Sequence, residues 1–336
     1  MNIRLAYGPQ QRFRFHHRDL NLTGRVEGAA FPLDHARFRL NGGPERPFYV
    51  DPVPDPGIDW TTQYKDSPAG LRLKDQGDFA VEFPVTAPEL RPGPNRLALS
   101  VRDARGLEAR TRLGFEWNPE PLPLPLDLSD LSGYGHVQDI GQVVNGAFDL
   151  DPRLNVIRSR APVYPDALLV LGSPHGGQEA TYRVRFSGFA GVKWLGPSDY
   201  FVGHEDADPP AGIKRGWSSA GMAALKPNGE ARSFIAFGDH CGTRQEWVVV
   251  TNPPKRFPVQ IHVDYRVRHQ VTFRGGVNAV RWRVWREGEP EPGAWLCEES
   301  DAAVDRALPR HRAGSFALFQ HSGMPIEWSD IRIAAI

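Results

Sequence analysis

The sequence predicts an all-β protein built from two sandwiches, and three observations lead to that prediction. The 34 glycines and 31 prolines among 336 residues interrupt the chain too often for long helices. Val259–Arg274, which contains neither residue, alternates apolar and polar side chains with a period of two, as a half-buried strand does. The alternating prolines of Asn118–Leu126 divide the chain into two parts.

The first part, residues 1–117, shows short β-like runs separated by turn signals with no helical pattern between them. The runs are Gln11–Phe15, His35–Leu40, Phe79–Phe83, Arg96–Arg102 and Ala109–Trp117. The turn signals are Asn41–Pro44, Asp51–Gly57 and Leu90–Asn95. Strands at this spacing predict a sandwich of about 100 residues.

The segment Leu90–Asp103 carries a resemblance to a known family. Its Leu-Arg-Pro-Gly-Pro-Asn turn leads into a strand that ends in the turn Asp103–Gly106. This arrangement resembles the penultimate turn and strand of bacterial Ig-like and fibronectin-type modules, which implies an Ig-like β-sandwich for residues 1–117. Residues 118–126 then form a Pro-rich linker, extended and semi-rigid. A ligand for an SH3-like partner is the alternative for this proline run.

The second part contains the long alternating run, which we expect to bend. A straight strand over Val259–Arg274 would span roughly 50 Å, so a break near Asp264 is predicted. Gly275 and Gly276 favour a hairpin turn, because glycine adopts positive φ without strain. The return strand is predicted over Asn278–Glu287, and a helix over Glu298–Leu308 that ends at Pro309.

Four segments of residues 127–336 resemble one family. They are Asp127–Tyr134, Val280–Pro292, Ala313–Gly323 and Ile326–Ile333, the last two similar to its closing hairpin. They resemble the concanavalin A-like (laminin G-like) jelly rolls, in the bacterial branch near the 3-keto-disaccharide hydrolase domain family. The resemblance implies a jelly-roll sandwich over 127–336. Residues 171–254, where substrate-determining residues would lie, do not align, so function does not carry over. Domains of this fold serve as glycan-binding lectins, as hydrolases and lyases of polysaccharides, and as adhesive modules.

Composition excludes several classes of function. The 40 basic and 40 acidic residues and a pI near 7.2 disfavour nucleic acid as the main partner. No apolar run approaches the ~18 residues of a membrane span. The N-terminus lacks the apolar stretch of a secretory signal, so we expect either a cytoplasmic protein or an exported protein in trimmed mature form. Cys241 and Cys297 lack metal-ligand spacing; they are two free thiols or one disulfide.

Catalytic candidates come from two loops, because the Glu-x-Asp-x-x-Glu signature of hydrolases with this fold is absent. Glu205 lies in an acidic cluster beside two prolines, and the alternative for it is a solvated loop. His240 follows the apolar strand Phe234–Phe237. Adjacent strand residues point to opposite faces, so Glu246 is its expected carboxylate partner, while an ordinary turn histidine is the alternative.

Binding candidates are arginines and aromatic residues. Arg183 and Arg266 belong to strands in which arginines alternate with apolar residues, and a guanidinium recognises carboxylate or sulfate groups, so an anionic polymer such as a uronic-acid glycan is the expected ligand. Ordinary cross-strand Arg–acid pairs are the alternative. Trp217 and Tyr200 are expected to stack on sugar, with burial in the core as the alternative for each, and His175 is a further loop candidate. Trp194 and Trp247 share the unaligned region.

Asp127, Asp149 and Asp330 lie near predicted sheet ends and are candidate ligands of a structural Ca²⁺. Together these features predict a carbohydrate-active protein that takes an oligo- or polysaccharide in the concave face of the jelly roll. We expect a glycoside hydrolase or polysaccharide lyase, with a non-catalytic glycan-binding or adhesion protein as the alternative.

Overall fold

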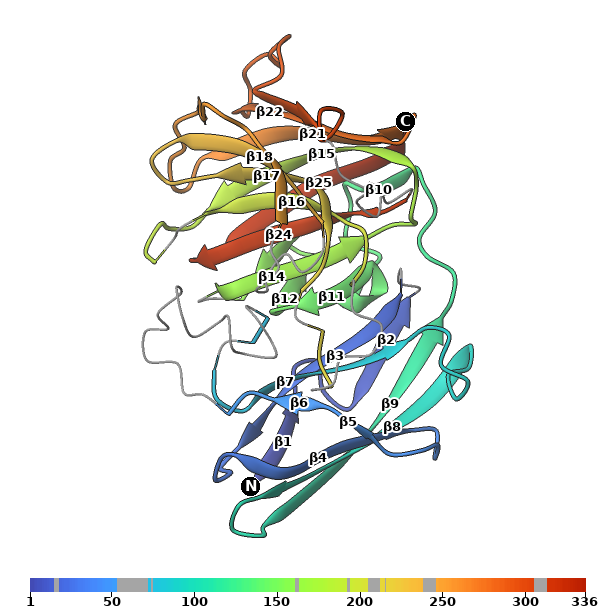
Figure 1. The fold of residues 1–336 in the computed structure, drawn as a ribbon. Coiled ribbons are helices and arrows are strands. Elements are labelled where there is room, and N and C mark those ends of the chain that lie inside the picture. The colour runs from blue at the N-terminus through green and yellow to red at the C-terminus, as the bar shows by residue number, and fades with distance from the viewer. Residues whose placement is uncertain are drawn as a thin grey trace.

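The computed structural model is an all-β protein (Figure 1). It describes residues 1–14, 18–52, 72–73, 75–160, 163–191, 194–204, 212–214, 216–237, 246–304 and 313–336. Within these residues the one helical element is the short 3-10 turn η1 (Val137–Asp139). No helix in the described residues is long and apolar enough to cross a membrane.

The N-terminal part is a sandwich of a four-stranded and a five-stranded sheet. The first has the order β1 (Asn2–Leu5), β3 (Asp19–Glu27), β7 (Asp78–Pro84), β6 (Tyr49–Val50). The second has the order β2 (Gln10–Arg14), β9 (Glu108–Asn118), β8 (Gly93–Asp103), β4 (Leu33–Leu40), β5 (Arg46–Pro47), with β2 parallel to β9. The five runs expected from sequence coincide with β2, β4, β7, β8 and β9, apart from Phe15, which lies outside the described residues, whereas β1, β3, β5 and β6 were not anticipated.

Alternating side chains from both sheets meet in one core that includes Leu20, Phe79, Phe83, Leu99 and Phe115. The turn before β8 is closed by Asn95, whose side-chain amide donates to the carbonyl of Arg91 (2.7 Å) and accepts from its N–H (3.1 Å). The asparagine thus replaces a missing backbone partner and fixes the start of the strand.

The C-terminal part is a jelly-roll sandwich of two larger sheets. Sheet I has the order β12 (Phe148–Asp151), β13 (Val156–Ser159), β25 (Ile326–Ala335), β15 (Gly177–Phe186), β21 (Asp264–Arg274), β22 (Val277–Arg286), β23 (Cys297–Ser300), and β10 (Leu126–Leu128) pairs with β25. Sheet II has the order β11 (Gly141–Asn145), β14 (Val163–Leu171), β24 (Ser315–Gly323), β16 (Gly196–Phe201), β17 (Ser219–Leu225), β18 (Glu230–Phe237), β19 (Glu246–Val250), and β20 (Lys255–Arg256) pairs with β18.

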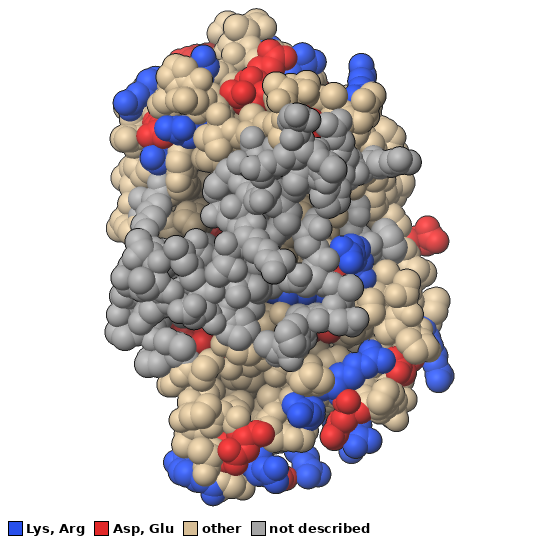
Figure 2. Space-filling model, viewed as in Figure 1, with Lys and Arg blue, Asp and Glu red and all other residues tan. Residues whose placement is uncertain are grey.

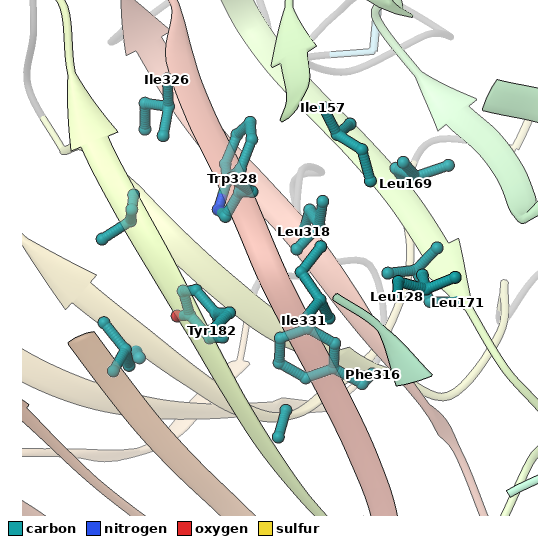
Figure 3. Close-up of a cluster of buried hydrophobic side chains, with 14 of the residues drawn as sticks. Leu128, Ile157, Leu169, Leu171, Tyr182, Phe316, Leu318, Ile326, Trp328 and Ile331 are labelled. Atoms are coloured by element: carbon teal, nitrogen blue, oxygen red, sulfur yellow. The ribbon is translucent and has the colours of Figure 1, made fainter. Parts of the chain in front are cut away.

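The inner faces of sheets I and II bury the largest apolar cluster of the molecule (Figure 3). Tyr182 and Trp328 from sheet I pack in the same cluster as Phe316 and Leu318 from sheet II, and each is at most 2% exposed. Each fully buried side chain of this size contributes on the order of 2 kcal/mol, so this layer supplies most of the stability of the C-terminal part.

In the C-terminal part the expected break, hairpin turn and return strand are confirmed, the last as β22, and the expected helix is wrong. β21 starts at Asp264, where the break was expected, and Gly275 and Gly276 have positive φ in the hairpin. The expected helix at Glu298 is a strand instead, because Cys297–Ser300 pairs with β22 and buries Cys297. Residues 305–308 of that prediction lie outside the described residues.

The closing hairpin also differs from expectation. β24 belongs to sheet II and β25 to sheet I, and Met324 and Pro325 carry the chain between the sheets after Gly323 (φ 94°). Placing the strands in opposite sheets lets the apolar face of β25 and the face of β24 that carries Phe316 and Leu318 meet in the same core, while Ala317 and Phe319 on the other face of β24 belong to a second buried cluster.

The two sandwiches pack directly on one another. The Tyr7 hydroxyl donates to the carbonyl of Phe148 (3.1 Å) and accepts its N–H (2.8 Å), and Gln138 Nε2 donates to Gln11 Oε1 (3.0 Å). Residues 119–125 join β9 to β10, and the side chains of Leu122 and Leu124 pack against the jelly-roll core.

Candidate functional site

The three residues expected to act as acid or base are not described as side chains. Glu205 and His240 lie outside the described residues. Glu246 begins β19 opposite Phe237, and its side chain is outside the described part. Their roles therefore stay predictions. Cys241 is likewise outside, whereas Cys297 is a buried free thiol whose pKa burial raises to about 12.

The two aromatic residues expected to stack on sugar are core residues instead. Trp217 is fully buried, and its indole N–H donates to Asp199 Oδ2 (3.1 Å). Tyr200 is 1% exposed, and its hydroxyl donates to the carbonyls of Gly314 (2.9 Å) and His175 (2.5 Å). A buried ring offers no face to a ligand, so neither serves as a platform. Sequence position alone gives no sign of this burial.

His175 lies in the loop between β14 and β15 and is exposed. Its backbone bridges to Gly314, and its Nδ1 lies 2.7 Å from the carbonyl oxygen of Gly177. The ring therefore holds this loop in place, and the His175 carbonyl accepts the hydroxyl of the buried Tyr200.

Arg183 and Arg266 face each other across β15 and β21 on the outer surface of sheet I, as expected for neighbouring strands. Carboxylates surround them. Arg266 pairs with Glu287 and Asp330, while Arg183 donates to the Ser329 hydroxyl (2.8 Å). Four further arginines of this face are paired as well, in the contacts Arg185–Asp264, Arg268–Glu179, Arg268–Glu291, Arg281–Glu298 and Arg283–Glu291, whereas Arg274 at the end of β21 is exposed.

The arrangement on sheet I matches the alternative of cross-strand ion pairs more closely than an open anion-binding surface. A shallow depression of about 400 Å³ on this face is lined by both signs of charge, including Arg266, Arg268 and Glu287 beside Trp285. An anionic ligand here would have to displace carboxylates that are already in place.

The three aspartates expected to bind calcium do not converge. Arg332 lies between Asp127 (3.5 Å) and Asp330 (2.7 Å), and Asp149 pairs with Arg160 (2.7 Å). No group of three or more acidic, histidine or cysteine side chains in the described part could hold a metal ion. The calcium site stays a prediction that these contacts do not support.

The outer face of sheet II carries a different constellation. Asp166 on β14 lies opposite His321 on β24, and His321 in turn forms a bridge with Trp194, just before β16. Directly opposed antiparallel residues point to the same side, so the three side chains form one cross-strand row. We name this row, Asp166–His321–Trp194, the sheet II row.

Within the sheet II row the histidine is held by a carboxylate. His321 Nδ1 is 2.6 Å from Asp166 Oδ1, and the side chains are 18% and 1% exposed. A buried carboxylate at Nδ1 fixes the ring orientation and leaves Nε2 as the nitrogen that can exchange a proton with a ligand. The pair therefore has the geometry of a proton-transfer group whose ring reaches the surface.

Trp194 is half-buried at the end of the sheet II row. Its ring meets Phe234 edge to face at 5.4 Å, and the Lys226 ammonium lies 4.3 Å from its centroid. Beside the row on the same face, the next pair in register along β14 and β24 is Leu168 and Phe319, which is apolar and buried. An aromatic ring held in this way beside a polar pair is suited to stack on a sugar ring.

Asp199, also on the outer face of sheet II, is not part of the row. It lies opposite Ala317, four positions along β24 from His321, or ~13 Å at strand rise. Burial raises the pKa of Asp199 to about 6, although Ser219, Trp217 and the Tyr200 N–H donate to it. The fully buried Asp199 side chain thus links β16 to β17 through these hydrogen bonds.

Sequence reasoning missed Asp166 and His321. His321 follows Ala317 and Phe319 at alternate positions of one strand, which shows its face, but Asp166 is 155 positions away and only the strand order brings it close. Trp194 was noted as an unaligned aromatic without a partner.

No family model matches this chain, and no curated protein matches it. Among solved structures it is similar to the carbohydrate-binding module CBM66 from Bacillus subtilis (9% identity, 58% of this chain and 95% of that chain, TM-score 0.38). It is also similar to lectin II from Ulex europaeus (9%, 63% and 97%, 0.38) and to the PL-14 alginate lyase from Aplysia kurodai (11%, 54% and 83%, 0.37). Values this low carry no argument about function.

Proposed function

We propose that this chain is a carbohydrate-active protein whose site is the sheet II row on the jelly roll. One observation carries the proposal: a histidine oriented by a buried aspartate lies in register with a half-buried tryptophan. The tryptophan supplies a stacking surface for a sugar ring, and the histidine supplies a proton-transfer group beside it.

The reaction that fits this row is cleavage of a glycosidic linkage. In hydrolysis, His321 would take a proton from the attacking water; in elimination, it would take the proton next to a uronic carboxylate. Asp166 acts as a positioning residue in both cases, because it holds Nδ1 and stabilises the charged ring.

Non-catalytic glycan binding is the second candidate, and a specific observation favours it. Glycosidic cleavage uses an acid as well as a base, and in the described part of the sheet II row His321 is the single surface-reaching proton-transfer group. Glu205, His240 and Glu246 remain proposed as sources of the second group.

The test measures new reducing ends and unsaturated products from a panel of neutral and acidic polysaccharides, with and without calcium. His321→Gln should lower turnover by about 10²-fold or more with glycan binding retained, because general-base catalysis is lost. Trp194→Ala should weaken binding about tenfold through loss of stacking. His262→Gln and Trp295→Ala, an exposed histidine and a half-buried tryptophan elsewhere on the jelly roll, are matched controls.

Product from wild type that is unchanged in His321→Gln would remove the row from the proposed mechanism. No product from any substrate, with binding that Trp194→Ala weakens, would establish the binding candidate instead. Neither product nor binding would end the carbohydrate proposal.

A further inference from the structure

The outer face of the five-stranded sheet, in the N-terminal sandwich, carries arginines in regular cross-strand rows. In one row Arg37 on β4 and Arg110 on β9 lie on either side of Ser100 on β8. In the next row, Arg39 and Arg112 lie on either side of Ala98 in the same way. Small side chains thus line the middle strand while long cationic ones rise on both flanks.

These rows form the walls of a groove of about 660 Å³ that runs along β8, which we name the β8 groove. Its lining contains five arginines, namely those four and Arg102, against the two acids Glu45 and Glu108. Figure 2 shows basic side chains interspersed with acidic ones at the lower end of the molecule, where Figure 1 places β4, β8 and β9.

The carboxylates do not neutralise the β8 groove. Glu45 pairs with Arg39 (3.0 Å), and Glu108 pairs with Arg110 (3.1 Å) and more distantly with Arg102 (3.9 Å). Arg37 and Arg112 have no carboxylate partner among the described residues. Arg37 donates to the carbonyl of Ala36 (3.0 Å), and Arg112 is exposed. The groove therefore keeps a net positive charge.

The positive surface continues past the end of the β8 groove. Arg96 lies two residues before Ala98 on the same face of β8, and with Arg91 it lines a second depression of about 370 Å³. The nearest further acid in register is Glu116, opposite Pro94. The cationic track thus extends over the length of a strand, which suits a polymer better than a single small anion.

We propose that the β8 groove binds a carboxylated polysaccharide, independently of the site proposed on the jelly roll. Flanking strands two spacings apart are ~10 Å from each other, which leaves room for a sugar chain over Ser100 and Ala98. Guanidinium groups on both sides match carboxylates bidentately, and the hydroxyl of Ser100, 3.1 Å from His35 Nε2, can bond to a sugar hydroxyl.

Charge and lining favour this polymer over a nucleic acid. Proteins that bind single strands stack bases on aromatic rings, and the lining of the β8 groove contains no Phe, Tyr or Trp. The chain as a whole carries no net charge, whereas nucleic-acid-binding domains are strongly basic.

The test is calorimetric titration of the full chain with polygalacturonate, and with neutral dextran, at low and at high NaCl. The groove variant is Arg37→Ser with Arg112→Ser, chosen because neither residue leaves an unpaired acid behind. The control is Arg274→Ser with Arg286→Ser, which removes the same charge from exposed positions of the jelly roll. Unchanged melting temperatures establish that both variants fold.

The groove variant should bind polygalacturonate at least about tenfold more weakly than wild type, because charge-assisted contacts are lost, while the control binds as wild type. Affinity should fall with salt, and dextran should not compete. Equal binding by both variants would overturn the proposal, and so would tighter binding of a single-stranded oligonucleotide. Trp194→Ala separates the two sites: a loss of polygalacturonate binding in that variant, with binding by the groove variant unchanged, would assign the polymer to the sheet II row and not to the groove.

Discussion

Two sheet faces of this molecule carry rows of arginine, and they differ in what stands beside each arginine. On sheet I, Arg268 lies between Glu179 and Glu291, and Glu291 also pairs with Arg283 at 2.5 Å. On the five-stranded sheet, the flanks of β8 hold more arginines than acids, and Arg112 has no carboxylate partner among the described residues. Basic and acidic side chains are thus balanced on the outer face of sheet I, whereas the outer face of the five-stranded sheet carries a net positive charge.

The difference shows that alternating arginines in a sequence mark a solvent-facing side of a strand and say nothing about its net charge. The charge depends on the register with the next strand and on loops such as the one that carries Glu291 after β22. The anionic ligand expected from the arginines of the jelly roll is therefore better placed on the other sandwich.

The largest loss of stability from breaking an ion pair is expected at an arginine that lies on neither of these two sheet faces. Arg72 is fully buried between the sandwiches, where it pairs with Glu82 and donates to Asn145 Oδ1 (2.7 Å) and to the Lys214 carbonyl (2.8 Å). Arg72→Met should cost about 3–5 kcal/mol, because it leaves the Glu82 carboxylate buried without its partner. Denaturant unfolding at pH 7 measures this loss.

A control for Arg72 follows from the raised pKa of Glu82, which burial pushes upward and Arg72 pulls down. Arg72→Met combined with Glu82→Gln should recover part of the stability, since no buried charge remains. A double variant as unstable as the sum of the single variants would show that packing, not charge pairing, holds the sandwiches together.

Low pH should also affect the stability of the two sandwiches to different extents. His269 is buried in the jelly-roll core with Nδ1 2.9 Å from the Ser198 hydroxyl, and burial lowers its pKa to about 3. An unfolded chain takes up that proton near pH 6.5, so stability is lost as pH falls from 6.5 toward 3, on the order of 4 kcal/mol in total. His204, also buried with a lowered pKa, acts in the same direction.

Asp199 opposes this trend, because its raised pKa of about 6 makes the folded state bind a proton first and adds stability as pH falls from 6 to 4. His269→Leu should therefore flatten the loss of stability between pH 6.5 and 4, and Asp199→Asn should steepen it. Parallel curves for wild type and His269→Leu would contradict the assignment. Among described residues the N-terminal sandwich buries no histidine, so acid should loosen the jelly roll first.

The sequence allowed the strands to be predicted more fully than the site, and particular residues show why. Alternation located β21 and its break at Asp264, because a half-buried strand has a local signature. The pairing of His321 with Asp166 needed the order of sheet II, which no local pattern encodes. Trp217 and Tyr200 were wrongly predicted to stack on sugar, because the identity of an aromatic residue does not show whether it is buried or exposed.

The balanced face can be converted into an unbalanced one. Glu179→Gln with Glu291→Gln leaves Arg268 and Arg283 without their carboxylates. We expect a stability loss of about 1 kcal/mol, as for partly exposed ion pairs, and new polygalacturonate binding at low salt. Glu298→Gln, which removes an exposed acid 3.6 Å from Arg281, is the control and should do neither. If the double variant gains no affinity, net charge alone does not distinguish the two faces.

The smallest change in stability is expected in the β8 groove itself. Whether that change is an increase or a decrease distinguishes the two faces. Arg112 lies across Ala98 from Arg39, so removing it relieves a repulsion and breaks no ion pair. Arg112→Ser should leave the melting temperature unchanged or slightly raised in ~10 mM salt, within about 0.5 kcal/mol. The gain should vanish in ~0.5 M salt, where screening shortens the Debye length below the distance between rows.

Arg283→Ser, on the balanced face, removes the contact with Glu291 and the stacking over Trp295 (4.4 Å) and should lower the melting temperature instead. If Arg112→Ser raises the melting temperature and Arg283→Ser lowers it, the arginines of sheet I stabilise the fold. Those of the β8 groove then destabilise the free protein slightly, by an amount that binding of a ligand can offset.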